Sequence, residues 1–198
     1  MAAMLAHAAL ALSLVVRIYD AYGVPEDRLQ AARTVVERIL KDADVDVTWA
    51  QCPCSARVGG AELVIRIAAA PVGSEPASLG FSYVDIDRKA GTVATVFADR
   101  VAVLARGGGA DEGGLLGRAM AHEVGHLLLG SRDHGRDGLM RGQWTTIELA
   151  RNRPWEWTLS RKEGAKMRQA IVRRTREPAQ PATVIAGLEL QTAAPQAH

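Results

Sequence analysis

The alternation of apolar and polar residues predicts strands and one helix in the first third of the chain. Apolar residues dominate positions 14–20, alternate with polar ones over 45–49 and run almost unbroken over 62–68, which predicts three strands. Between the first two, apolar residues recur at helical spacing after Pro25-Glu26-Asp27. A proline followed by acidic residues is typical of a first helical turn. The predicted order is therefore strand, helix, strand, strand.

The middle of the chain predicts a β-hairpin followed by a glycine-rich connector. Residues 79–87 and 92–97 have strand patterns, and residues 88–91 between them are typical of a hairpin turn. Residues 101–105 either extend this hairpin or form a short helix. Residues 107–114 are rich in glycine but lack the Gly-Lys-Ser/Thr ending of a phosphate-binding loop, so we expect a flexible linker there.

The remaining patterns predict helices and a C-terminal tail, which makes the chain an α/β protein. Residues 112–129 are apolar on most sides of a helix and predict a buried one. Thr145 or Thr146 with Glu148 indicates a further helix start. Residues 160–177 contain seven Lys or Arg against two Glu. We interpret them as a helix with a solvated basic face, the alternative being contact with an acidic surface. Residues 178–198, with three prolines, predict a disordered tail.

Composition narrows the class of protein only slightly. A chain of 198 residues predicts one domain, which we expect over 14–177, after an apolar leader or frayed N-terminus at 1–13. The apolar start favours a secreted or periplasmic location over a cytoplasmic one, although no basic residue precedes it. The net charge of +2 and the lack of a bilayer-length apolar run favour neither nucleic acid nor membrane as an obligatory partner. The oligomeric state stays open.

Two cysteines add little to this picture. A disulfide between Cys52 and Cys54, with one residue between them, would be strained, and the C-x-x-C spacing of zinc sites is absent. We expect a pair of thiols.

The predicted buried helix contains the clearest chemical signal, the pattern H-E-x-x-H. His122 and His126 are four residues apart, so a helix places both imidazoles on one face, one turn apart. Buried imidazoles need a partner, and two held this way can bind one Zn²⁺ while Glu123 reaches a water on the metal. Three of the five histidines, His122, His126 and His134, fall within thirteen positions. This clustering favours a metal site over isolated core residues.

A third ligand is expected shortly after the helix. Gly130 is suited to end the helix in a left-handed turn, and Asp133 and His134 follow it. We favour His134, since imidazole suits zinc well. Asp133 and Glu148, the latter on the next predicted helix, are the alternatives.

The segment from Ala121 to Met140 resembles the extended motif of the metzincin zinc peptidases, in which a glycine turn leads to a third ligand and a methionine lies beneath the metal. The resemblance implies His122, His126 and His134 as metal ligands, Glu123 as catalytic base and Met140 as the methionine beneath the metal. This chain has three residues on each side of Gly130 where the clan usually has two, and Asp133 lies at the clan's usual offset. Glu148 would instead correspond to the gluzincin pattern.

The resemblance also implies a fold and an activity. It implies a twisted mixed sheet packed on a helix and on the zinc-binding active-site helix, with a helical C-terminal part. Residues 79–84 correspond to the edge strand that pairs with an extended peptide or protein substrate. We therefore expect a zinc-dependent endopeptidase that hydrolyses peptide bonds with a metal-activated water. The alternatives are a gluzincin-like zinc hydrolase that uses Glu148 and a non-catalytic zinc-binding protein derived from a peptidase.

Overall fold

The computed structural model of the chain describes residues 12–51, 61–75 and 77–176. The expected leader up to residue 11, Cys52 and Cys54, and the tail from residue 178 lie outside these ranges. Within them the chain is α/β, with a five-stranded mixed sheet and five α-helices. The strands are β1 (Leu12–Asp20), β2 (Val45–Gln51), β3 (Glu62–Ala68), β4 (Gly80–Asp85) and β5 (Ala90–Phe97). The helices are α1 (Glu26–Lys41), α2 (Ala98–Gly108), α3 (Glu112–Leu129), α4 (Thr146–Arg151) and α5 (Arg161–Thr175), with a 3₁₀ turn, η1 (Pro154–Trp157), before α5.

The sheet order is β2-β1-β3-β5-β4, and only β4 runs antiparallel to its neighbour. β3 is buried on both faces, as its unbroken apolar run predicts. β4 follows a long loop and turns back through residues 86–89 into β5, which confirms the predicted hairpin. Among the described strands β4 therefore forms one edge of the sheet, and its inner side lies beside α3.

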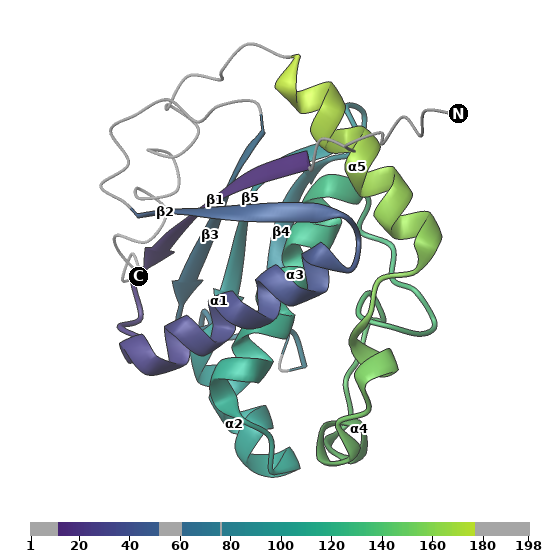
Figure 1. The fold of residues 1–198 in the computed structure, drawn as a ribbon. Helices are drawn as coiled ribbons and strands as arrows, with labels where there is room; N and C mark the ends of the chain where they lie inside the picture. The colour runs from purple at the N-terminus through teal and green to yellow at the C-terminus, as the bar shows by residue number, and fades with distance from the viewer. Residues whose placement is uncertain (1–11, 52–60, 76, 177–198) are drawn as a thin grey trace, which may run out of the picture.

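α1 and α3 lie side by side on one face of the sheet, and α5 contacts α3 and β1 (Figure 1). Glycines in α3 allow α1 to approach closely. A Cβ atom at Gly117 would lie 2.5 Å from the backbone oxygen of Ala32, and one at Gly113 would lie 2.8 Å from that of Arg28. α3 is consequently buried over almost its whole length, as predicted.

The expected flexible linker at 107–114 is wrong in extent. Gly107 and Gly108 belong to α2, which also answers the open question about residues 101–105, and Gly113 and Gly114 belong to α3. Only residues 109–111 connect the two helices. Glycine-rich sequence predicts flexibility from local propensity, but here packing decides the conformation: Gly113 lies against α1 and Gly108 against Leu149 of α4.

The solvated basic face expected for residues 160–177 is confirmed for five of its seven basic residues, which are exposed, but not for Arg168, which is half-buried, or Arg174. The side chain of Arg174 is buried and donates to the backbone oxygens of Gly91 and Leu127. Arg168 donates to the backbone oxygen of Ala43 at 2.7 Å. These two arginines therefore attach α5 to the hairpin, to α3 and to the end of α1. No helix in the described part of the chain combines the length and the apolar character needed to cross a bilayer.

Candidate metal centre

α3 holds the candidate site in a fixed frame. Its N-terminus is capped by Asp111, whose carboxylate accepts a hydrogen bond from the backbone N–H of Gly114. Its C-terminus ends at Gly130, which has the left-handed conformation expected of it (φ 63°). His122, Glu123 and His126 are all buried in the last two turns.

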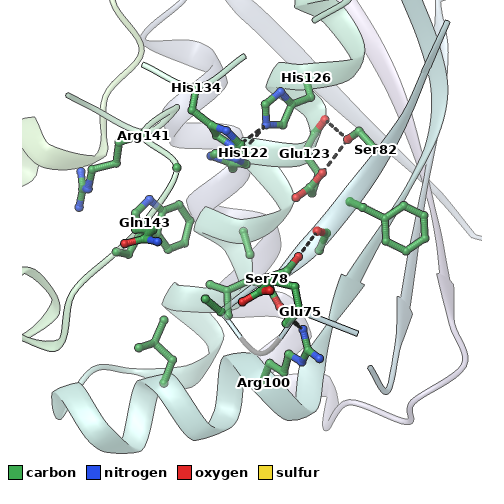
Figure 2. Close-up of a pocket in the computed structure, with 18 of the residues that line it drawn as sticks. Glu75, Ser78, Ser82, Arg100, His122, Glu123, His126, His134, Arg141 and Gln143 are labelled. Carbon is green, nitrogen blue, oxygen red and sulfur yellow. Dashed lines mark hydrogen bonds between the residues drawn. The ribbon is translucent and has the colours of Figure 1, made fainter. Parts of the chain in front are cut away.

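The structure brings three imidazoles together, those of His122, His126 and His134 (Figure 2). Nε2 of His126 lies 3.0 Å from Nε2 of His122 and 3.3 Å from Nε2 of His134. Within the described residues this is the one group of three or more possible metal-ligating side chains whose ligand atoms converge. His134 is exposed, whereas the other two rings are buried.

Backbone carbonyls fix the orientation of the two helical histidines. Nδ1 of His122 lies 2.9 Å from the backbone oxygen of Leu139, and Nδ1 of His126 lies 2.8 Å from that of Ser131. A carbonyl oxygen only accepts, so both Nδ1 atoms are the protonated nitrogens and both Nε2 atoms carry lone pairs. Burial lowers the pKa of His122 to about 4 and lowers that of His126 as well. Both rings are therefore neutral at pH 7.

This arrangement fits a metal ion well. Two Nε2 lone pairs that face each other at 3.0 Å cannot hydrogen-bond to one another, so a cation is the partner that satisfies both. Tetrahedral zinc with Zn–N bonds of about 2.05 Å would separate its nitrogen ligands by roughly 3.3 Å. The two distances from Nε2 of His126, 3.0 and 3.3 Å, are close to that spacing. The chain thus has a three-histidine cluster compatible with a metal ion of the zinc type.

Glu123 is oriented by the edge strand β4. The Ser82 hydroxyl lies 2.6 Å from Oε2 of Glu123 and 2.9 Å from its backbone oxygen. Gly80, two residues earlier on the same side of the strand, leaves room for the other carboxylate oxygen, since a Cβ atom there would lie 2.9 Å from Oε1. Burial raises the pKa of Glu123 to about 7, and the hydrogen bond from Ser82 opposes this shift.

The loop after α3 carries His134 back over the helix. Gly135 donates its backbone N–H to the backbone oxygen of Met140 at 2.8 Å, which closes the loop. The sulfur of Met140 packs directly against Gly125, where a Cβ atom would overlap it. Met140 thus lies against the turn of α3 between the two helical histidines, consistent with the place implied for it.

The two alternative third ligands lie outside the cluster. The Asp133 carboxylate is exposed and accepts a hydrogen bond from the Ser131 hydroxyl at 2.7 Å. Glu148 caps α4, where its carboxylate accepts hydrogen bonds from the backbone N–H and the hydroxyl of Thr145 and lies 3.3 Å from Nε of Arg141. These interactions, chiefly the hydrogen bond from the Thr145 backbone, lower the pKa of Glu148.

An open cleft of about 1010 Å³ runs from the histidines along β4 toward α2. The three imidazoles and Glu123 lie at one end, and Glu75, Ser78 and Arg100 lie at the other (Figure 2). Its walls are mainly apolar: Leu79 and Phe81 from the β4 side, Val103 and Leu104 from α2, and Trp144 from the segment after Met140. The histidine cluster is therefore accessible to an extended ligand.

Several residues that build the site could not be identified from the sequence. Ser82 and Gly80 lie about forty positions from Glu123 in a strand pattern that marks neither of them. The carbonyls of Leu139 and Ser131 act through the backbone, which is independent of side-chain type. The place of Arg141 depends on the path of the loop after α3, which the sequence does not show.

No protein-family model and no curated protein sequence matches the chain.

Proposed function

We propose that the protein is a zinc-dependent endopeptidase of metzincin type, with His122, His126 and His134 as zinc ligands. The observation that supports this most is the convergence of three imidazoles on the wall of an open cleft, with Nε2 of His126 at near zinc-like spacing from the other two. Three protein ligands leave one tetrahedral position free, which is typical of catalytic rather than structural zinc sites. Zinc bound there would polarise a peptide carbonyl and make a water more acidic.

Glu123 is the proposed general base. Its carboxylate lines the cleft beside the histidines, and a pKa near 7 allows it both to accept a proton and to return one at neutral pH. It would take a proton from the attacking water and deliver it to the leaving amine. A purely structural zinc site has no need of a buried carboxylate between its ligands, and burying one is costly. Glu123 therefore favours the enzyme over the non-catalytic zinc-binding protein.

The edge strand supports a peptide as substrate. β4 borders the cleft over Gly80, Phe81, Ser82 and Tyr83, and among the described strands its outer side has no partner. An extended peptide can add to such an edge by main-chain hydrogen bonds. This arrangement would hold a peptide bond beside Glu123 and the histidines, because Ser82 hydrogen-bonds to the Glu123 side chain and a Cβ atom at Gly80 would lie only 2.9 Å from it.

The test is cleavage of an unfolded protein by the wild type and by Glu123→Gln. The variant keeps the side-chain shape and the bond to Ser82 but removes the base. We expect it to bind zinc nearly as the wild type does and to lose at least ~100-fold in cleavage rate, the lower end of a general base's contribution. Glu112→Gln, at the start of the same helix and far from the histidines, removes a half-buried carboxylate that pairs with Arg28; it is the matched control and should keep full activity.

Equal cleavage by wild type and Glu123→Gln would contradict the proposed role of this residue. No cleavage of any unfolded protein or peptide by a zinc-loaded wild type would favour the non-catalytic zinc-binding protein instead.

A further inference from the structure

One short segment, residues 138–142, packs against α3 near His122 and His126 and also against His134 on the following loop. We call it the support segment. Its Leu139 carbonyl accepts the hydrogen bond from His122. Its Met140 packs against α3 between the two helical histidines. Its Gly142 lies against the third imidazole, where a Cβ atom would be 3.2 Å from Cγ of His134. A shift of this segment would therefore move the ligands relative to one another.

Arg141 attaches the support segment to the C-terminal part of the chain. Its guanidinium points away from the imidazoles (Figure 2), and the residue is only 7% exposed. Nη1 donates to the backbone oxygen of Gly138 at 2.9 Å and to that of Glu156 at 2.6 Å. The first bond closes the segment on itself, and the second joins it to η1.

The indole ring of Trp157 packs against the guanidinium of Arg141 and against that of Arg118. Cζ of Arg141 lies 4.5 Å from the centre of the indole ring, and Cζ of Arg118 lies 4.0 Å from it. Arg118 belongs to α3, one turn before His122, and hydrogen-bonds to the side chain of Asn152. Both arginines are buried and stack on the same indole, but of the two only Arg141 is seen to hydrogen-bond to the support segment.

We infer that Arg141 is a positioning residue of the metal centre, which holds the support segment so that Leu139 orients His122 and Gly142 bounds His134. The inference rests on the proposed zinc site. Groups that orient metal ligands from outside the coordination sphere typically change metal affinity by about 10- to 100-fold when they are removed. A residue that contributed only stability would change the unfolding temperature without changing affinity in the folded protein.

The experiment compares zinc affinity, by chelator competition, with the melting temperature of the metal-free protein in wild type, Arg141→Met and Arg118→Met. Methionine keeps an unbranched apolar side chain against Trp157 in both variants. We expect both to lower the melting temperature by comparable amounts. Only Arg141→Met should raise the zinc dissociation constant, by about 10-fold or more. Arg118→Met is the matched control, because it removes the same kind of stacking without releasing the support segment.

Unchanged zinc affinity in Arg141→Met, or an equal loss in both variants, would overturn the inference and leave the proposed function intact. A wild type that binds no zinc would overturn both. If Arg141→Met does not fold, Arg141→Lys answers the question, since lysine keeps a charged donor but not the planar fork. It should bind zinc more weakly than Arg118→Met, and an affinity equal to that of the control would also overturn the inference.

Discussion

The glycine that ends α3 shows how single residues set the geometry of the site. Gly130 has a φ of 63°, and a Cβ atom there would overlap the backbone of Lys89 in the β4–β5 turn. The following residue, Ser131, supplies the carbonyl that orients His126. Gly130 thus fixes both the end of the helix and its distance from the hairpin.

Gly109 provides a matched comparison for a substitution at Gly130. It ends α2 with a φ of 61°, but a Cβ atom there would have open space around it. Alanine at Gly109 should cost only the left-handed strain, about 1 kcal/mol. Gly130→Ala should cost clearly more, because the Lys89 backbone must also move, and it should weaken zinc binding. Urea unfolding and zinc titration of both variants measure this, and equal costs would contradict the close packing seen here.

At the residue scale, the sequence could predict what helix geometry alone determines. The spacing of His122 and His126 on a helix leaves little choice about where their rings point, and the structure brings them together. The sequence favoured His134 over Asp133 on ligand chemistry alone, and the structure places His134 in the cluster. Helix geometry could not establish this choice, because the path of a loop determines which side chain turns inward. Ser82 was not predictable either, since its contact with Glu123 depends on the pairing of distant elements.

At the scale of elements, α4 explains why Glu148 is directed away from the cluster. Thr145 and Glu148 form a reciprocal capping box, in which each side chain accepts from the other residue's backbone N–H. The sequence pattern predicted a helix start at this point, and the structure confirms it with Thr145 as the cap. A carboxylate used in this way stabilises α4 and is directed at the first turn of its own helix.

Substitution of Glu148 separates helix capping from metal binding. Glutamine also serves in a capping box, so Glu148→Gln should change stability little, whereas Glu148→Ala should lower it by about 1 kcal/mol. Neither should change the amount of zinc bound per chain. Elemental analysis combined with urea unfolding gives both quantities. Loss of zinc in the alanine variant alone, at full folding, would instead support the gluzincin alternative.

Element boundaries were predictable where burial and periodicity agree, as in β3 and α3. The predictions failed where packing overrides local propensity. Gly113 and Gly117 are poor helix formers, yet α1 requires their lack of side chains. Likewise, the arginines of α5 were predicted to be solvated from composition, but Arg174 is buried against backbone carbonyls that only the folded chain brings near it.

At the scale of the whole molecule, the site lies where three parts of the fold meet. α3 supplies two histidines and Glu123, the edge strand β4 orients that glutamate, and the chain after Gly130 supplies His134 and the support segment. Binding of a metal by ligands from α3 and from this later segment would join these parts, so metal binding and folding should be linked.

The most direct test of the central claim is the zinc content of protein purified without chelator. We expect about one equivalent per chain in the wild type and in Glu123→Gln, since the three imidazoles and not the carboxylate are the proposed ligands. His126→Ala should lose most of the zinc, because Nε2 of His126 is the nitrogen that lies near both of the others. A wild type without zinc, or full retention of zinc by a folded His126→Ala, would contradict the claim that these three histidines form a zinc site.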